Sequence, residues 1–498
     1  MNSKKQTLLF SILVLGIIGL RYYVLVHFGF KYSDSDQAIM WNALRNYSEG
    51  EFHEPRFYGQ AYNSMLEAFL AIPLYKMGVP CYKALPIVTT FISLFPFFLI
   101  SFFTLRFKST FISLIILSIP LLMPINYHLI TTLPRGFVTG IFIASFGIIS
   151  IFYLKKKWAF FLLGFCSVIG YSINANSVIL SLPCLLYVFL WNRKNITFYI
   201  YSGIAIVLGG MLHFWTNHFY VSNANYNLHK FELKYSFDLL IKNMGNLDPF
   251  FNDLSPLFWN QGFIWIIIAL LTGIVLIWKR KIQYGILFLS IPILLILPLG
   301  INKVNDSTNS IFFSISRMYL SLPILIAVCL TFINKLKPNY YYIIIPFLLL
   351  WYNAAHIDSV INDKFGPNIK HIVSVAKVDS VLELCKNINR LCSINDIDLV
   401  VVVRHGNQDF INYGCPACLT DFPKTIRPSY ERRTWRLLED EKNTYSNILF
   451  IDSENQLNQE FDFIEQIEFH ENIFIVKNNQ LTTMKLFNKM NLKIRNYK

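Results

Sequence analysis

Two carboxylates, Asp34 and Asp36, stand in the stretch KYSDSDQAIMWN, shortly after the first long apolar segment of the chain. Ionisable groups beside a bilayer are costly and usually mark function. A carboxylate placed within hydrogen-bond reach of a hydroxyl can act as its general base. The D-x-D spacing can also hold Mg²⁺ or Mn²⁺ through carboxylate oxygens. The structural alternative is helix capping, because Ser33, Asp34 and Ser35 all suit the N-cap of a helix that begins near Gln37.

The residues that follow add polar side chains to the same loop, which spans residues 29–81 and is long for a connection between apolar segments. Loops of this length are often functional. Gly59 predicts a tight turn, followed by an apolar helix over 61–78 that lies at the membrane interface. On that helix Gln60, Asn63 and Glu67 form one polar stripe. The candidate substrate-binding residues of this loop are Asp34, Arg56, Tyr58, Gln60 and Glu67.

The elements that position these residues are membrane spans. Of the 498 residues, 54% are hydrophobic and only 15% are charged. Apolar runs of about 17–25 residues recur, which is long enough to cross a hydrocarbon core. We therefore expect a polytopic all-α membrane protein with an uncleaved first span. The eleven expected spans lie near residues 7–28, 82–104, 109–126, 134–154, 158–174, 177–191, 197–217, 259–278, 282–301, 315–333 and 340–357.

The charge distribution orients these spans. With the N-terminus inside, the six expected cytoplasmic pieces carry 14 basic residues and no acid, which equals the formal net charge of +14. This is the positive-inside pattern, and it explains the excess of bases without a nucleic-acid partner. Every acid then lies outside or at an outer span end, and none lies in the middle of a span. An ion-coupled transporter usually has such mid-membrane acids, so the pattern disfavours that class.

A late segment, SISRMYLSLPI, carries Arg317 at the outer end of a span, and the early segment DQA carries Asp36. An apolar span, an outer loop that opens with an acidic pair, an interfacial helix and about ten further spans resemble the GT-C superfamily of glycosyltransferases. The likeness is to its bacterial protein O-mannosyltransferase-like and aminoarabinose-transferase-like members. It covers residues 1–357. Gln37 stands where the family motif has a Glu, so the role of the second acid falls to Asp34 or is lost.

The resemblance implies a reaction on the outer face of a bacterial inner membrane. The donor is a sugar on a polyprenyl phosphate, and the acceptor is a hydroxyl of a protein, a glycolipid or a glycan. Asp36 is the implied base, the reaction inverts the anomeric centre, and no metal is required. Arg or Lys groups hold the phosphate, although an Arg at a span end can also be a membrane anchor. The candidates for this clamp are Arg56, Arg135, Lys303 and Arg317.

Two other functions remain open. A flippase or transporter of lipid-linked glycans shares the membrane topology, but it needs polar residues along a path through the membrane. A polysaccharide polymerase or ligase shares the number of spans and usually has a large loop later in the chain. The only such loop here, residues 218–258, has Asp248 and Asp253 but no obvious basic cluster.

Residues 358–498 change to a mixed polar composition and predict a soluble extracytoplasmic α/β domain. Strands are expected at 397–403, 447–451 and 472–477, with a helix over 368–388. Cys385, Cys392, Cys415 and Cys418 are candidates for disulfides in an oxidising compartment, and a Cys₄ zinc site or a redox Cys-x-x-C are the alternatives. The other cysteines, which we expect to be small buried hydrophobes, are Cys81, Cys166, Cys184 and Cys329.

Overall fold

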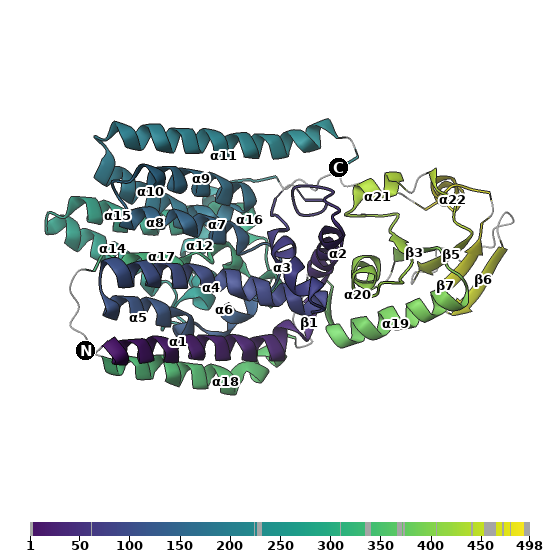
Figure 1. The fold of residues 1–498 in the computed structure, drawn as a ribbon, viewed down its shortest axis with the longest axis horizontal. Coiled ribbons are helices and arrows are strands. Elements are labelled where there is room, and N and C mark those ends of the chain that lie inside the picture. Colours follow the sequence, from purple (N-terminus) through teal and green to yellow (C-terminus); the bar gives the residue numbers. More distant parts are fainter. Residues whose placement is uncertain are drawn as a thin grey trace. The chain divides into compact units, whose positions relative to one another are not determined.

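The computed structural model describes residues 3–60, 62–223, 225–226, 232–308, 310–333, 340–365, 371, 374–404, 406–439, 442–452, 465–470, 473–478 and 480–492. The chain forms two compact units. The first contains Met1–Gly29, Pro86–Trp215 and Glu232–Ile372. The second contains Phe30–Leu85, Thr216–Phe231 and Val373–Lys498, so by its contacts the first long loop belongs with the C-terminal residues (Figure 1).

The first unit is helical. Among the described residues, six helical stretches are long and apolar enough to cross a membrane, and the protein is therefore membrane-embedded. They are Lys5–Gly29, Cys81–Phe107, Ala175–Asn192, Ile196–Ser222, Ile282–Gly300 and Tyr340–Lys364. Each remaining expected span also coincides with an apolar helix, of 10–17 residues, and the total of eleven crossings stays a prediction. These shorter stretches are Thr110–Leu122, Thr139–Phe152, Lys157–Ile173, Ile264–Trp278 and Ile315–Leu330.

The long elements of the unit are helices because a backbone in lipid must satisfy its own hydrogen bonds. The α-helices are α1 (Ser3–Val24), α4 (Cys81–Phe107), α5 (Thr110–Ser118), α6 (Ile125–Ile130), α7 (Thr139–Gly147), α8 (Ile149–Phe152), α9 (Lys157–Ile173), α10 (Val178–Asn192), α11 (Ile196–Ser222), α12 (Phe237–Met244), α13 (Asp248–Phe251), α14 (Ile264–Trp278), α15 (Ile282–Ile296), α16 (Asn302–Asn305), α17 (Leu322–Leu330) and α18 (Ile344–Lys364). Helices α4 and α11 contribute residues to both units. Single turns of 3-10 or π geometry are η1 (Leu25–Gly29), η2 (Ile119–Leu122), η3 (Ala175–Ser177), η4 (Asn252–Leu254), η5 (Leu297–Gly300), η6 (Ile311–Phe313), η7 (Ile315–Tyr319) and η8 (Tyr340–Ile343).

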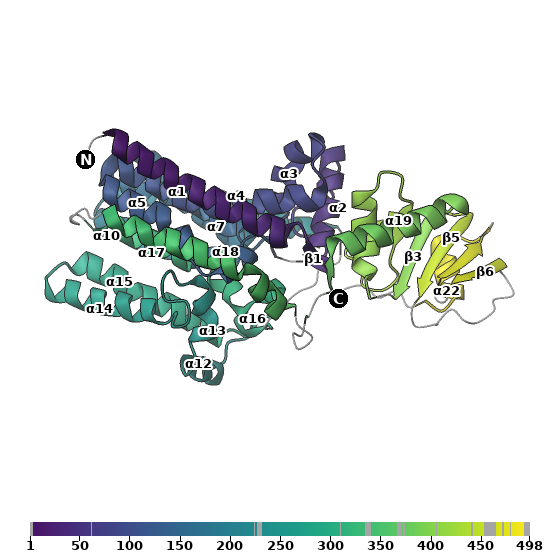
Figure 2. The ribbon, with the colours of Figure 1, turned by 90° about the horizontal axis from the view of Figure 1, so that it is seen from below.

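Small residues bring these helices together. A Cβ at Gly140 on α7 would lie 2.8 Å from the Gly170 carbonyl on α9, so no larger side chain fits there. Gly273 on α14 and Gly285 on α15 make a second close crossing, and Figure 2 shows the two helices side by side. Membrane helices commonly pack through small residues because lipid supplies no hydrophobic drive for their association.

The second unit combines helices with two sheets. Strand β1 (Tyr32–Asp34) pairs antiparallel with β2 (Val375–Lys377). The larger sheet has the order β4-β3-β5-β7-β6, in which β3 is parallel to β4 and β5, and β7 is antiparallel to both of its neighbours. Its strands are β3 (Leu399–Arg404), β4 (Lys424–Ile426), β5 (Asn447–Asp452), β6 (Glu465–His470) and β7 (Ile473–Lys477). The helices are α2 (Ser35–Glu49), α3 (Leu66–Lys76), α19 (Val378–Ile394), α20 (Cys415–Cys418), α21 (Thr434–Glu439) and α22 (Thr483–Lys489), with one π turn, η9 (Phe410–Gly414).

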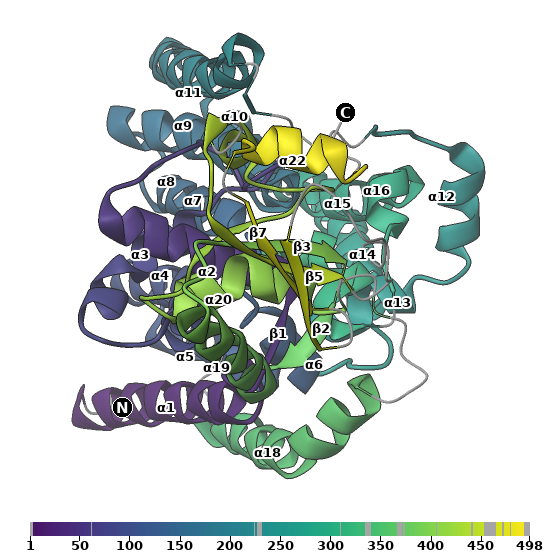
Figure 3. The ribbon, with the colours of Figure 1, turned by 90° about the vertical axis from the view of Figure 1, so that its right-hand side faces the viewer.

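One hydrophobic cluster of this unit lies on one face of the five-stranded sheet. Leu399 and Val401 of β3, Phe450 of β5 and Phe474 of β7 are buried together with Leu486 of α22. Alternate residues of a strand point to the same face, so β3 contributes every second side chain to this core. Figure 3 shows α22 crossing the sheet. Burial of such side chains stabilises the sheet by about 1.5–3 kcal/mol each.

Some expected elements differ from the structure. The expected strands at 397–403, 447–451 and 472–477 correspond to β3, β5 and β7, although residue 472 lies outside the described residues. The expected helix over 368–388 is wrong in its first part, because Val375–Lys377 pairs with β1 and the helix begins at Val378. Of the preceding positions, 368–370, 372 and 373 lie outside the described residues.

Candidate functional site

Asp34 caps a helix. It is the last residue of β1 and the N-cap of α2, and its Oδ1 accepts a hydrogen bond of 2.9 Å from the Gln37 amide. Its side chain is fully buried, and the Ser35 amide donates to the Ser374 carbonyl beside the β1–β2 ladder. An N-cap of this kind contributes about 1 kcal/mol. The structure thus assigns Asp34 a structural task, whereas its role in binding stays a prediction.

Asp36 lies in the first turn of α2, with its side chain half-buried. Its charge acts on Asp409, as do the charges of Arg427 and Arg432. Burial raises the pKa of Asp409, and the charge of Asp36 raises it further, whereas Arg427 and Arg432 act in the opposite direction. Asp409 accepts a hydrogen bond of 2.6 Å from Arg427 Nη1. Asp36 is therefore part of a cluster of two carboxylates and two guanidiniums, which we call the Asp36 cluster.

The sequence did not single out Asp409, Arg427 or Arg432. Asp409 follows β3, and Arg427 directly follows β4. The carboxyl ends of adjacent parallel strands meet at one edge of a sheet, which is where polar groups often form sites. Of these two strands only β3 was predicted, because β4 has three residues and gives no clear pattern. If β4 had been predicted, the ends of β3 and β4 would have pointed to Asp409 and Arg427.

A buried ion pair supports this edge of the sheet. Arg433 Nε lies 3.2 Å from Glu431 Oε1, and Asn412 Nδ2 donates to Glu431 Oε2 at 2.7 Å. Arg433 Nη2 also donates to the Thr425 carbonyl at 3.1 Å. Burial alone raises the pKa of Glu431, but the charge and hydrogen bonds of Arg433 outweigh it, so the net pKa lies below its usual value. The pair therefore stays ionised and fixes the segment that carries Arg427 and Arg432.

Arg56 is hydrogen-bonded to the C-terminal end of α11. Its Nη2 donates to Asn217 Oδ1 at 2.7 Å, and its amide donates to the Tyr220 hydroxyl at 3.1 Å. The same hydroxyl donates to Glu54 Oε2 at 2.9 Å. Burial raises the pKa of Glu54 well above its usual value. Glu54 is thus a further buried carboxyl of the second unit, and it is not among the candidates drawn from the sequence.

Tyr58, Gln60 and Glu67 are all buried, but they do not share a helix face. The expected stripe of Gln60, Asn63 and Glu67 is wrong, because α3 begins only at Leu66. Two residues with positive φ, Gly59 at 68° and Asn63 at 62°, turn the chain before the helix. The Phe57 amide closes this turn on the Asn63 carbonyl. The tight turn predicted at Gly59 is confirmed.

Three expected phosphate ligands lie in the first unit and gather on one segment. Arg317 lies 4.0 Å above the ring of Phe313, and Arg135 lies 5.6 Å from the same ring, so the two guanidiniums are neighbours. Both are buried. Arg317 Nη1 donates to the Ser314 carbonyl at 2.8 Å, and Arg135 Nη1 donates to the Phe312 carbonyl.

Lys303 completes this group, which we call the cation cluster (Arg135, Lys303 and Arg317). Its Nζ lies 3.4 Å from Asp306 Oδ2, and the backbone carbonyl of Asp306 accepts from Arg317 Nη2. Arg, with its planar fork of donors, is well suited to bind phosphate oxygens. The structure thus joins three residues that the sequence placed only at separate span ends.

Asp253 fixes the segment on which the cation cluster stands. Its Oδ2 accepts from the hydroxyls of Ser314 and Ser316 at 3.2 and 3.0 Å, and its Oδ1 accepts from Asn126 at 2.9 Å. The loop 218–258, whose own sequence has no obvious basic cluster, therefore contributes an acid to the region of the cation cluster. Its Asp is used to hold the backbone in place.

The candidates thus form two groups. Asp34, Asp36, Arg56, Tyr58, Gln60 and Glu67 belong to the second unit, and Arg135, Lys303 and Arg317 belong to the first. Within the described residues, no group of three or more His, Cys, Asp and Glu side chains is arranged to hold a metal. Mg²⁺ or Mn²⁺ at Asp34 and Asp36 stays a hypothesis, and the cap already occupies one oxygen of Asp34.

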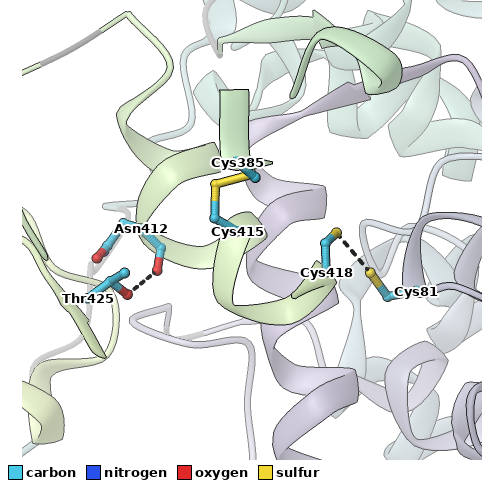
Figure 4. The surroundings of a disulfide bond; sticks show 6 residues. All are labelled: Cys81, Cys385, Asn412, Cys415, Cys418 and Thr425. Atoms are coloured by element: carbon cyan, nitrogen blue, oxygen red, sulfur yellow. Dashed lines mark hydrogen bonds between the residues drawn. A yellow bond between two sulfur atoms is a disulfide. The ribbon is translucent and has the colours of Figure 1, made fainter. Parts of the chain in front are cut away.

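The C-terminal cysteines pair only in part. Cys385 and Cys415 form a disulfide that joins α19 to α20, with 5.1 Å between their Cα atoms (Figure 4). A Cys₄ zinc site is not what the structure has, since this bond uses two of the four sulfurs. Cys392 is a buried free thiol, and Cys418 lies beside Cys81, whose Sγ is 3.5 Å away.

Comparison with known proteins gives no matching family model, no matching curated protein and no matching solved structure. The fold and the apolar helices define the class of the molecule, a membrane-embedded helical protein with a second unit built around a mixed sheet. The glycosyltransferase resemblance is carried by the residues alone.

Proposed function

We propose that the chain is an integral-membrane glycosyltransferase that moves a sugar from a polyprenyl phosphate to an acceptor hydroxyl. The observation that carries this proposal is the cation cluster. Arg135 comes from a distant part of the sequence and meets Lys303 and Arg317, which lie on one short segment between apolar helices. Such a group suits a phosphate that is attached to an apolar chain in the bilayer.

Asp36 is the proposed base. The capping bond occupies Asp34, whereas Asp36 is half-buried and belongs to a polar cluster. A base removes the proton of the acceptor hydroxyl while its oxygen attacks the anomeric carbon. The phosphate leaves with the electron pair of the broken bond, and fixed cations stabilise the negative charge that it gains. Direct displacement of this kind inverts the anomeric centre.

The proposed setting is the outer face of a bacterial inner membrane. The positive-inside pattern supports this orientation, since all expected cytoplasmic pieces are basic. The disulfide between Cys385 and Cys415 supports an oxidising compartment for the C-terminal residues. The acceptor is a protein, a glycolipid or a growing glycan.

The test of the donor site measures transfer from a synthetic polyprenyl-phosphate sugar in proteoliposomes. We expect R135Q and R317Q to raise the KM for the donor about tenfold to hundredfold, because each removes a charge-assisted hydrogen bond to phosphate. R106Q is the matched control, since Arg106 is an exposed Arg in the last turn of α4 and does not belong to the cation cluster. An unchanged donor KM in both cluster variants would refute the phosphate site.

The same proteoliposomes separate the alternatives. A flippase moves the lipid-linked sugar across the bilayer and forms no new glycosidic bond. A polymerase or ligase consumes a lipid-linked oligosaccharide in preference to a monosaccharide donor. Product analysis by mass spectrometry distinguishes the three, and our proposal requires a new glycosidic bond made from the monosaccharide donor.

A further inference from the structure

A second pair of cysteines lies close to the disulfide of the second unit. Cys81 is the first residue of α4, and Cys418 is the last residue of α20. Their Sγ atoms are 3.5 Å apart, and both side chains point toward one another in Figure 4. The two residues are 337 positions apart in the sequence, so no local pattern could have paired them.

We propose that Cys81 and Cys418 form a second disulfide, which joins the start of α4 to α20. A disulfide has an S–S distance of about 2.05 Å, so the two sulfurs need to approach by about 1.5 Å. Rotation of two short side chains supplies a movement of this size. Cys81 is buried, whereas Cys418 is half-buried and can be reached from outside.

The neighbouring disulfide indicates the conditions under which this bond forms. Cys415 and Cys418 are the first and last residues of one four-residue helix, α20, so they share a compartment. An environment that oxidises Cys385 and Cys415 also contains an oxidant for Cys418. The same argument applies to Cys81, because its sulfur is already in contact with that of Cys418.

The reaction is a thiol–disulfide exchange with a protein or small-molecule disulfide as oxidant. The Cys418 thiolate attacks the oxidant, forms a mixed disulfide and releases one oxidant sulfur as a thiol. The Cys81 thiolate then attacks the Cys418 sulfur and releases the second oxidant thiol. Both protons of the cysteines end on the oxidant, which is reduced by two electrons.

Helix α2 holds α20, which carries Cys418, in place before the bond forms. Arg45 on α2 donates from Nη1 to the carbonyl of Pro416, and Nη1 also lies 3.5 Å from the carbonyl of Leu419. Its Nε binds Glu49 on the same helix at 3.0 Å. The aromatic ring of Trp41 lies 6.2 Å from that of Phe410, just before α20. The end of α20 therefore has a fixed position, and Cys418 stays close to Cys81 without a rearrangement of the backbone.

The direct test is a disulfide map of the full-length protein from the cell envelope. Free thiols are blocked with an alkylating agent at lysis, and the protein is digested without reductant and analysed by mass spectrometry. We expect a linked peptide that contains Cys81 and Cys418, beside the Cys385–Cys415 peptide. Alkylation of both Cys81 and Cys418, or a Cys415–Cys418 bond, would overturn the proposal.

Single and double variants give a second, independent test. If the bond exists, C81S and C418S each lower the melting temperature by the same amount, about 5 °C or more, and the double variant loses no more than either single variant. C392S is the matched control, because Cys392 is a buried free thiol of the same unit. The loss of melting temperature caused by C392S should add to that caused by C418S. Additive losses for C81S and C418S would contradict a shared bond.

Discussion

At the scale of single residues, Asp34 and Asp36 lie close together in the sequence but differ in their interactions. Asp34 accepts a hydrogen bond from the amide of Gln37 and is buried, whereas the charge of Asp36 acts on Asp409, which is paired with Arg427. The sequence identifies the pair, because acids beside a bilayer are rare. It cannot separate their roles, since both positions suit a helix N-terminus.

The buried ion pair of Arg433 and Glu431 predicts how one substitution changes the stability of the second unit. R433A leaves the Glu431 carboxylate buried without its charge partner, which should cost about 3–5 kcal/mol of the free energy of unfolding. We expect a clear fall in melting temperature and faster proteolysis of the second unit. R390A is the control, because Arg390 is exposed on α19 of the same unit. Equal melting temperatures for the two variants would contradict the structural role of the pair.

Glu54 predicts a dependence of stability on pH. Burial raises the pKa of this carboxyl well above its ordinary value of 4.5 in the folded protein. The folded state therefore holds its proton more tightly than the unfolded state, and stability falls as pH rises from about 4.5 through the folded pKa. E54Q keeps an uncharged side chain of the same size and removes this dependence. Melting curves against pH should thus be flatter for E54Q than for the wild type, and parallel curves would contradict the prediction.

At the scale of elements, close helix crossings give the sharpest prediction. G140A places a Cβ 2.8 Å from the Gly170 carbonyl, so α7 and α9 must separate. Overpacking of this kind costs about 1–3 kcal/mol. G203A is the control, since a Cβ at Gly203 on α11 meets nothing within 4 Å and improves helix propensity. We expect a lower melting temperature for G140A only, measured in detergent or nanodiscs.

Most helices could be predicted from the sequence, and the reasons are physical. Apolar runs of sufficient length must be helical in lipid, so every expected span coincides with a helix. The start of α3 was missed because the expected helix began at residue 61 and ran across Asn63, whose positive φ breaks a helix. The start of α19 was missed because the residues before it pair with β1, a distant strand that no local pattern reveals.

At the scale of the whole molecule, the grouping of distant segments is what the sequence could not provide. The cation cluster was predicted residue by residue, because an Arg at an outer span end stands out in an apolar chain. The partners of Asp36 were not, since Asp409 and Arg427 lie in a part of the chain more than three hundred positions away. The contact of Cys81 with Cys418 was missed for the same reason.

The orientation in the membrane makes a prediction for the whole chain. If all expected basic pieces are cytoplasmic, the C-terminal residues lie outside. A protease added to spheroplasts should then cleave within residues 373–498 while cytoplasmic marker proteins stay intact. Protection of this region until the membrane is opened with detergent would show the opposite orientation.

The central claim is sugar transfer from a polyprenyl phosphate with Asp36 as base, and single-turnover transfer in proteoliposomes tests it most directly. We predict that D36N lowers the rate of transfer at least about 100-fold with donor binding retained, because only the base is lost. D34N is the matched control, since Asn is also a good N-cap, and it should keep most of the activity. Formation of the glycosidic bond at the wild-type rate by D36N would contradict the account.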